Sequence, residues 1–309
     1  MASTVSRFGR ARYFLRRFIV HGRIRVILQF VFTKLQSLFI QQTIFPYFVT
    51  FLPFKKSSYA YVIPKVTSPG EVGKSGLPTP PEKLWMGYGR TIEEWLESGQ
   101  RHVEKMRGLL RDSGYQFERG HRILEWGCAA GRMLRCLEDV ANKCEIWGTD
   151  INGDALFWCK QNLSPPFHFF MTTTTPHLPF SDEYFDVIYA GSVFTNLDDL
   201  ADTWFLELRR LLKPDGRLYI TIHDNHTIRL LGEQNHDLSK TLFCRRDYFE
   251  NNDFAMFTIG RFMRSLVFYD TDYLVQSLKP FYEICSITPE AYGFQTGLLL
   301  RKRSAPRLD

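Results

Sequence analysis

Short apolar runs alternate with longer amphipathic segments from residue 91 to residue 302. Apolar residues on one side of a 3.6-residue period predict a helix, whereas a brief apolar run bounded by polar residues, Gly or Pro predicts a buried strand. This pattern predicts strands at residues 122–126, 145–149, 167–171, 185–190 and 217–223, and its clearest helices at 91–112 and 199–212. Thr91 is suited to cap the first of these helices.

Strands that alternate with helices predict an α/β fold, in which a mostly parallel, doubly wound sheet is covered on both faces. The last segment, FYEICSITPEAYGFQTGLLLRKR, departs from this rhythm, because two apolar runs flank a turn at Tyr292 and Gly293. It predicts an antiparallel C-terminal hairpin at the sheet edge, which brings the sheet to seven strands. Ligands of such sheets bind beyond the carboxyl ends of the parallel strands.

Charge divides the chain into two parts. Residues 1–70 hold eleven Lys and Arg and no Asp or Glu, so the rest of the chain keeps 28 of the 39 basic residues and all 33 acidic ones. The N-terminal part therefore carries +11 and the remainder −5, within a net charge of +6. Since the phosphate-neutralising charge lies outside the main body, no specific nucleic-acid partner is expected.

The basic segment also alternates with Phe, Ile and Leu, which predicts a helical N-terminal arm over residues 1–56. Pro46 interrupts its longest uncharged stretch, so residues 7–56 fit a helix on an anionic membrane surface better than a spanning helix. An Arg-rich organellar transit segment, or a helix packed on the body or on a partner subunit, are the alternatives. Residues 57–84 are interpreted as a linker, 85–302 as the folded domain and 303–309 as a tail.

With 309 residues and 44% hydrophobic residues, the chain can fill a substantial core. Its six cysteines form no C-x-x-C pair and no His/Cys cluster of zinc-site spacing, so no metal site is predicted. This cysteine usage is typical of reduced thiols in an intracellular protein. We therefore expect a cytoplasmic protein, with peripheral membrane association or an organellar location as the readings suggested by the arm.

The stretch ILEWGCAAGR, residues 123–132, joins a predicted strand to a turn of small residues that lets a ligand approach the backbone. A helix is predicted to follow the turn and to offer free amide donors. A dinucleotide fingerprint needs Gly at the positions of Gly127, Ala129 and Arg132, and only the first matches. The pattern acid-x-Gly-x-Gly-x-Gly matches at Glu125, Gly127 and Gly131, and Ala129 stands where the pattern has its middle Gly. A nicotinamide dehydrogenase is accordingly disfavoured.

Four segments in order, ILEWGCAAGRMLRCL, WGTDIN, LPFSDEYFDVIYAGSVFTNL and ELRRLLKPDGRLYITIH, resemble the class I S-adenosylmethionine-dependent methyltransferases, in particular the type 11 and type 25 domains. The resemblance extends from about residue 80 to residue 302 and implies a Rossmann-like sheet with S-adenosylmethionine as cofactor. It also implies that a loop holds the methionine part of the cofactor, that Glu125 lies near the ammonium group and that Asp150 accepts the ribose hydroxyls. The residues of that loop are Gly127, Cys128, Ala129, Ala130 and Gly131.

The residue types support the ribose role of Asp150 independently. Asp150 ends the second strand 23 residues after Gly127, close to the offset of about 20 residues at which an acid meets a ribose in related sites. A helix cap is the alternative for Asp150, and a buried ion pair is the alternative for Glu125. Cys128 has no evident base beside it and is interpreted as a small hydrophobic residue.

Two positions depart from the family pattern. Ala129 replaces the usual middle Gly, which is compatible with the turn if its φ is negative. Where many relatives have an Asp for the adenine amine, this chain has a run of threonines, so Thr174 or a backbone carbonyl is predicted to replace it. The further cofactor contacts predicted are Ile151, Ser192, Tyr88 and Arg90, with Trp85 and Tyr88 as packing residues in the alternative reading.

Catalytic candidates lie at the ends of the fourth and fifth strands. His223 is the predicted general base, with a structural role as its alternative, and Asn196 is predicted to orient the acceptor because an amide cannot act as a base at neutral pH. Gln295 either faces the acceptor or is a solvated turn residue. The remaining candidates are Ser192, Thr195, Asp224 and His226 at the strand ends, and Phe254, Phe257, Phe262, Phe268, Arg245, Arg246, Arg261 and Arg264 for an apolar and anion-binding acceptor pocket or an ordinary amphipathic cover.

The predicted function is therefore methyl transfer from S-adenosylmethionine to a small-molecule or lipid- or sugar-linked acceptor, at oxygen. The alternative is a methyltransferase-like subunit without activity, docked through its N-terminal arm. Ala129, the threonine run and Asn196 favour the alternative, whereas Glu125 and Asp150 favour the enzyme.

Overall fold

The computed structural model describes residues 49–51, 59–61, 76–233, 254–260 and 265–303. Most of the predicted arm, residues 1–48, lies outside this set. From the arm and linker the structure describes only two short antiparallel strands, β1 (Val49–Phe51) and β2 (Tyr59–Tyr61), and the residues from Gly76 onward. Among the described residues, no helix combines the length and the apolar character that crossing a membrane requires.

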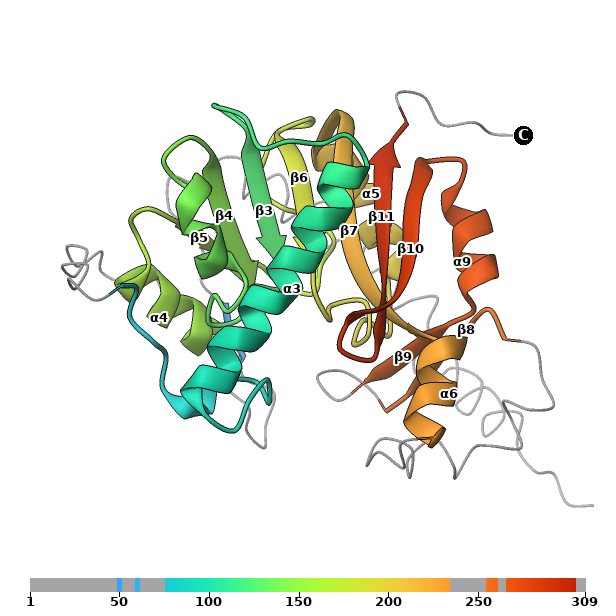
Figure 1. Ribbon diagram of the computed structural model, residues 1–309, viewed down its shortest axis with the longest axis horizontal. Coiled ribbons are helices and arrows are strands. Elements are labelled where there is room, and N and C mark those ends of the chain that lie inside the picture. The colour runs from blue at the N-terminus through green and yellow to red at the C-terminus, as the bar shows by residue number, and fades with distance from the viewer. Residues whose placement is uncertain (1–48, 52–58, 62–75, 234–253, 261–264, 304–309) are drawn as a thin grey trace, which may run out of the picture.

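The domain alternates helices and strands much as the apolar pattern predicts (Figure 1). Thr91 caps the first long helix, since its hydroxyl accepts the amide hydrogen of Glu94. In chain order the elements are η1 (Glu82–Leu84), α3 (Ile92–Asp112), β3 (Arg122–Trp126), η2 (Leu134–Val140), β4 (Glu145–Asp150), α4 (Gly153–Asn162), β5 (His168–Met171), β6 (Phe185–Ala190), α5 (Ala201–Leu211), β7 (Leu212–Asp224), α6 (Asn225–Glu233), β8 (Met256–Ile259), β9 (Leu266–Tyr269), α9 (Thr271–Leu278), β10 (Tyr282–Tyr292) and β11 (Gln295–Lys302).

The main sheet has the order β10-β11-β7-β6-β3-β4-β5. Its strands β5, β4, β3, β6 and β7 pair in parallel, whereas β11 pairs antiparallel with both β7 and β10. The predicted α/β class and C-terminal hairpin are thus confirmed. The second strand of the hairpin lies inside the sheet, next to β7, and only the first strand forms the edge.

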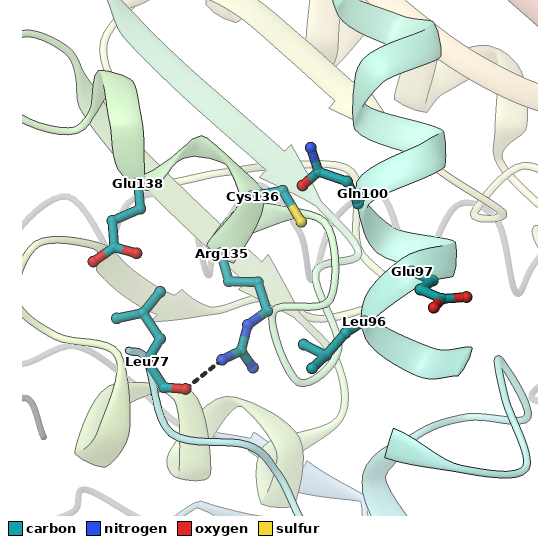
Figure 2. Close-up of a pocket in the computed structure, with 7 residues that line it drawn as sticks. All are labelled: Leu77, Leu96, Glu97, Gln100, Arg135, Cys136 and Glu138. Carbon is teal, nitrogen blue, oxygen red and sulfur yellow. Dashed lines mark hydrogen bonds between the residues drawn. The ribbon is translucent and has the colours of Figure 1, made fainter. Parts of the chain in front are cut away.

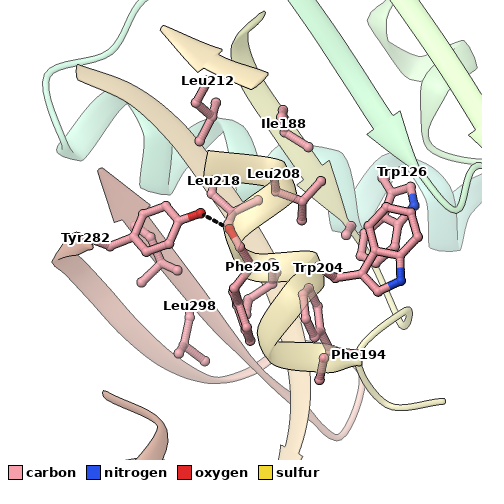
Figure 3. Close-up of a cluster of buried hydrophobic side chains, with 14 of the residues drawn as sticks. Trp126, Ile188, Phe194, Trp204, Phe205, Leu208, Leu212, Leu218, Tyr282 and Leu298 are labelled. Atoms are coloured by element: carbon pink, nitrogen blue, oxygen red, sulfur yellow. Dashed lines mark hydrogen bonds between the residues drawn. The ribbon is translucent and has the colours of Figure 1, made fainter. Parts of the chain in front are cut away.

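Two apolar layers hold the helices on the two faces of the sheet. Ile123 packs in the layer under α3 and α4, while its neighbour Leu124 packs in the layer under α5 and α9, because successive side chains of a strand point to opposite faces. Figure 3 shows the second layer, with Trp126 beside Trp204. The centres of these two rings are 4.4 Å apart. The sheet is therefore rigid on both sides where its parallel strands end.

Three boundaries differ from the prediction. Strand β7 begins at Leu212 rather than at residue 217, and α5 begins at Ala201 because Leu200 before it has a left-handed φ of 62°. After Gly131 the chain forms a turn and the short 3₁₀ segment η2 instead of an α-helix. The amides expected at a helix start are accordingly not arranged as an anion-binding helix end.

The carboxyl end of strand β7 extends beyond its pairing with β6 and β11. Its last two residues, His223 and Asp224, pair in parallel with β9, which also pairs with β8. In Figure 1 this small sheet and α6 lie beside the carboxyl ends of the main strands. The segment after β7 therefore contributes structure at the edge where ligands of such sheets bind.

Candidate cofactor and acceptor site

The glycine turn after β3 is held by backbone hydrogen bonds. The amides of Gly127 and Cys128 both donate to the carbonyl oxygen of Thr149, at 2.8 and 2.9 Å. Gly127 has a φ of 85°, and a methyl group added there would lie 2.3 Å from Cγ2 of Val193. Only glycine meets both demands at this position, since other residues disfavour positive φ and would overlap with Val193.

Ala129 adopts a φ of 43°, so the negative φ that would make an alanine compatible with the turn is not found. The left-handed conformation costs an L-residue about 1 kcal/mol or more. It turns the Ala129 amide toward Oδ2 of Asp150, to which it donates at 2.7 Å, and its carbonyl accepts from Sγ of Cys159 at 3.4 Å. These bonds offset the strain and fix the turn against the end of β4.

Glu125 is a buried carboxylate directly before the turn, 3% exposed. Its strand partner on β6 is Tyr189, whose hydroxyl donates to Oε2 of Glu125 at 3.1 Å. Burial raises the pKa of Glu125 to about 8, although Tyr189 and the positive charge of Arg132 act in the opposite direction. Such a group gains from a ligand cation, because a positive charge beside it restores the ionised form. The predicted neighbour, an ammonium group, fits this site.

Asp150 lies at the carboxyl end of β4 and is held by two backbone donors. Oδ2 accepts from the amide of Ala129 and Oδ1 accepts from the amide of Asn152, each at 2.7 Å. Burial raises its pKa, against the effect of these amides. The helix cap of α4 is Asn152, whose side chain accepts from Ala155, so the cap role considered for Asp150 belongs to its neighbour. Each carboxylate oxygen keeps a second lone pair for a hydroxyl, which fits the predicted ribose contact. Ile151 follows Asp150 and is partly exposed.

The residues before α3 form a strap, residues 77–90, that packs against the turn. Leu84 is buried with Ala130 and Ala155, and Trp85 and Tyr88 pack at the edge of this cluster. At the far end of the strap, Nη2 of Arg135 donates to the carbonyl oxygen of Leu77 at 2.6 Å, beside a surface cavity of about 360 Å³ between α3 and η2 (Figure 2). The strap is thereby fastened across the loop that joins β3 to η2.

Arg132 is a buried cation between the strap and the sheet. Its Nη1 donates to the hydroxyl of Ser98 at 3.1 Å and to Nδ1 of His102 at 3.0 Å, and its Nη2 donates to the hydroxyl of Tyr292. The guanidinium carbon lies 3.9 Å from the ring centre of Tyr88. Burial and the nearby positive charge lower the pKa of His102 to about 3, so its neutral ring can accept this bond. Arg90, the other predicted strap contact, is exposed, and its amide donates to Glu94.

The predicted cofactor contacts Cys128 and Thr174 differ in burial. Cys128 is buried, and burial raises the pKa of its thiol well above the usual range, so it is not a thiolate at neutral pH. Thr174 is exposed, whereas Thr172 is buried beside the end of β4 and its amide donates to the carbonyl of Asp150 at 3.2 Å. The adenine contact of Thr174 stays a prediction, and Thr172 is the residue of the threonine run whose backbone bonds to the ribose candidate Asp150.

A second polar group occupies the ends of β6, β7 and β11. Ser192 has a left-handed φ of 59°, and its amide donates to the hydroxyl of Thr221 at 2.7 Å. Gln295 is 5% exposed and bridges these two residues, so its reading as a solvated turn residue is wrong. The hydroxyls of Ser192 and Thr195 lie 3.1 Å apart, and the side-chain amide of Asn196 donates to Thr195 at 3.0 Å. Asn196 thus orients a neighbour of Ser192.

His223 lies deeper than a solvent-facing base. It is 3% exposed, and its ring lies 5.0 Å from Phe268 and 5.6 Å from Phe294, between ring centres. Burial lowers its pKa to about 4, so the imidazole is neutral at pH 7. No hydrogen-bond partner of its Nδ1 occurs within the described residues. Its role as general base stays a prediction, and its surroundings favour packing.

The neighbouring candidates cap and brace α6. Asp224 is buried, and its Oδ1 accepts the amide and the hydroxyl of Thr227. His226 pairs with Oε1 of Glu290 at 3.1 Å. Of the predicted pocket aromatics, Phe268 is fully buried and stacks on Phe257, while Phe254 packs edge to face against Phe257. The candidates that lie outside the described residues are Phe262, Arg245, Arg246, Arg261 and Arg264.

Three residues of the site were not predicted from the sequence. Tyr189 and Thr221 occupy apolar strands, where a hydroxyl is not conspicuous, and Arg132 was considered only as a mismatch to a dinucleotide fingerprint. The signal that could have identified them is a single polar side chain within an otherwise apolar run or directly after the glycine turn.

Comparison with known proteins agrees with this geometry. Residues 124–220 match the family model described as a methyltransferase domain. The chain is 29% identical over 108 residues to the ubiquinone/menaquinone biosynthesis C-methyltransferase UbiE of Paraburkholderia phymatum, which is 33% of this chain and 42% of that protein. It is 27% identical over 135 residues to the methyltransferase GfsG of Streptomyces halstedii, which is 42% of this chain and 46% of that protein. The chain thus spans less than half the length of these curated relatives.

Solved structures with a similar chain include a SAM-dependent methyltransferase from Aquifex aeolicus, at 15% identity and a TM-score of 0.47, covering 73% of this chain and 100% of that one. The PH0226 protein from Pyrococcus horikoshii has 18% identity and a TM-score of 0.46, covering 65% of this chain and 89% of that one. The matched methyltransferase domain over residues 124–220, with Glu125 and Asp150 beside the glycine turn, supports a class I S-adenosylmethionine-dependent methyltransferase domain with S-adenosylmethionine as its cofactor.

Proposed function

We propose that the protein transfers the methyl group of S-adenosylmethionine to an oxygen atom of a small-molecule acceptor. The observation that carries the proposal is the buried Glu125 carboxylate at the glycine turn, which has a hydroxyl as its hydrogen-bond partner and a pKa raised to about 8. A ligand with an ammonium group stabilises the ionised form of the Glu125 carboxyl group. Asp150, oriented by two amides, is available to a pair of hydroxyls. S-adenosylmethionine carries both groups.

When bound, the cofactor supplies an electrophilic methyl group together with its leaving group. The protein then has to align the acceptor in line with that methyl group and exclude water. The strap with Tyr88 packs against one side of the turn. The hydrogen-bonded ends of β6, β7 and β11 lie on the acceptor side. Their hydroxyl and amide groups are suited to orient an oxygen atom, because they are fixed by one another.

The direct test is calorimetric titration of the full chain with S-adenosylmethionine. We expect binding with a micromolar dissociation constant, weakened at least tenfold in Glu125→Gln. Absence of binding at millimolar cofactor would instead favour the alternative proposal of a structural subunit without activity, which the strained Ala129 supports.

Lipid- or sugar-linked acceptors and a membrane surface belong to the same proposal through the charge of the arm, which carries eleven basic and no acidic residues over residues 1–70. The full chain should then bind vesicles containing phosphatidylserine and not vesicles of phosphatidylcholine alone, and the difference should vanish in high salt. Equal binding to both kinds of vesicle would contradict a peripheral location on anionic membranes.

A further inference from the structure

We propose that the hydroxyl of Ser192 donates a hydrogen bond to the acceptor oxygen and that Gln295 and Thr195 fix it in this direction. We infer that the acceptor is an acidic phenol or enol, which ionises near neutral pH. The inference rests on the proposed function and names its substrate class. Ser192 follows β6, and Gln295 begins β11, so two segments distant in sequence build this donor.

The position of Ser192 is beside the predicted cofactor loop. Its neighbour Val193 is the residue that a methyl group on Gly127 would overlap, at 2.3 Å. Ser192 itself is half-buried and has a φ of 59°. Non-glycine residues in this conformation cluster at functional sites, and here it directs the Ser192 amide to Thr221 and its side chain to Gln295.

The hydrogen on Thr221 decides how the Gln295 amide is oriented. Oγ1 of Thr221 accepts from the amide of Ser192 and lies 2.6 Å from Oε1 of Gln295. Since Thr221 is fully buried, its hydroxyl hydrogen needs an acceptor, and Oε1 provides it. The opposite orientation of the amide would leave this hydrogen buried and unpaired. Nε2 of Gln295 is therefore the atom that donates to Oγ of Ser192, at 2.9 Å.

The hydrogen on Thr195 decides the next bond. Thr195 is fully buried, and its Oγ1 already accepts from the side-chain amide of Asn196. If Ser192 donated to Thr195, the hydrogen on Thr195 would have no acceptor within the described residues. Thr195 therefore donates to Ser192, so Oγ of Ser192 accepts two hydrogen bonds. Its own hydrogen remains available at the partly exposed end of the network, and the two accepted bonds polarise it as a donor.

A committed donor and a weak base together restrict the acceptor. His223 is enclosed by Phe268 and Phe294, and its pKa is lowered to about 4, so it cannot deprotonate an aliphatic alcohol. An electron-poor phenol, or an enol conjugated with a carbonyl group, loses its proton to solvent near neutral pH, and a fixed donor stabilises the resulting oxyanion. That oxygen forms the new bond to the methyl carbon, the carbon–sulfur bond breaks, and its electron pair remains on sulfur as the sulfonium becomes a neutral thioether.

The test uses 4-nitrophenol as the acceptor probe, because its anion absorbs visible light. The full chain is saturated with S-adenosylhomocysteine, and nitrophenolate binding and the apparent pKa of the bound phenol are followed by absorbance from pH 5 to 9. We expect the wild type to lower the pKa of the bound phenol, and Ser192→Ala to abolish this shift and weaken nitrophenolate binding about tenfold.

Gln295→Glu is a near-isosteric second variant. A carboxylate at this position cannot donate to Ser192 but accepts from it, which reverses the donor, so the same losses are expected. Gln161→Glu, on the exposed face of α4, is the matched control and should behave as wild type. Melting temperatures and S-adenosylhomocysteine affinities check that the variants fold, and the affinities should stay within about threefold of wild type.

Unchanged nitrophenolate binding and an unchanged pKa shift in both Ser192→Ala and Gln295→Glu would overturn the inference. Failure of the wild type to bind 4-nitrophenol at millimolar concentration, with S-adenosylhomocysteine bound, would overturn it as well and leave methyl transfer standing. Failure to bind S-adenosylhomocysteine at all would overturn the proposed function itself.

Discussion

The cofactor half and the acceptor half of the site differ in charge and in how their side chains are held. On the cofactor side, Glu125 and Asp150 are acidic, and short backbone bonds across the turn between β3 and β4 hold Asp150 in place. On the acceptor side, Ser192, Thr221 and Gln295 are neutral and hold one another from three separate strands' ends. The first half is built mainly from residues 125–152, with Tyr189 of β6 as the partner of Glu125, and the second half is built by the assembled sheet.

This difference has an energetic side. The cofactor half keeps a buried carboxyl group whose ionised form is disfavoured, and a left-handed backbone that costs folding free energy. A bound ammonium group would stabilise the ionised form. The acceptor half satisfies its buried hydroxyls internally, so it is expected to be stable before any ligand binds. Changes on the cofactor side should therefore weaken the binding of S-adenosylmethionine strongly. Changes behind the acceptor side should affect the binding of S-adenosylmethionine little.

Gly127→Ala should give the largest effect. The added methyl group would meet Val193, and φ would be unfavourable, so we expect a loss of about 3 kcal/mol of stability and at least a hundredfold weaker cofactor binding. Chemical denaturation and calorimetry measure the two. Gly114→Ala is the matched control, since Gly114 has a similar φ of 78° with open space around it. If both variants behaved alike, the overlap with Val193 would have no consequence.

Asp150→Asn should have the next largest effect. An amide presents one oxygen where the carboxylate accepts two backbone hydrogens, so the Ala129 or Asn152 amide loses its acceptor. We expect about thirtyfold weaker binding of S-adenosylmethionine by calorimetry. Asp154→Asn, an exposed change in the first turn of α4, should leave the affinity within about twofold. Equal losses in the two variants would mean that a general charge effect, and not the held carboxylate, matters.

Glu125 should make the stability of the ligand-free protein depend on pH. Its pKa is raised to about 8 in the folded chain, from 4.5, so the unfolded chain releases this proton first as pH rises. Stability should therefore be highest below about pH 4.5 as far as this group is concerned, and fall toward pH 8 by up to about 1.4 kcal/mol per pH unit. Urea denaturation at several pH values should show a flatter profile in Glu125→Gln. Parallel profiles for the two proteins would contradict the raised pKa.

His223→Phe should have the smallest effect. The ring already packs between Phe268 and Phe294, and Nδ1 has no partner within the described residues, so phenylalanine would lose only the hydrogen bond to the backbone of Val267. We expect a stability loss of about 1 kcal/mol and a rate of 4-nitrophenol methylation within about threefold of wild type. A hundredfold slower reaction with unchanged cofactor affinity would establish His223 as the base.

The same contrast governs what the sequence alone could predict. Glu125, Gly127 and Asp150 were found because the glycine pattern and the strand-end acid resemble a known family, and both are local features of the sequence. The left-handed φ of Ala129 was not, because spacing records a small residue and not its conformation. Ser192 was found, but its partners Thr221 and Gln295 lie 29 and 103 residues away, and only the insertion of β11 beside β7 brings them together.

The most direct test of the account is the pH dependence of cofactor affinity in the wild type and in Glu125→Gln. Because binding an ammonium group favours the ionised carboxylate, affinity for S-adenosylmethionine should rise as pH increases from 6 to 8, by up to about tenfold per unit. Glu125→Gln should bind more weakly and without this dependence. Equal affinities in the two proteins at every pH would contradict the central claim that Glu125 holds the cofactor.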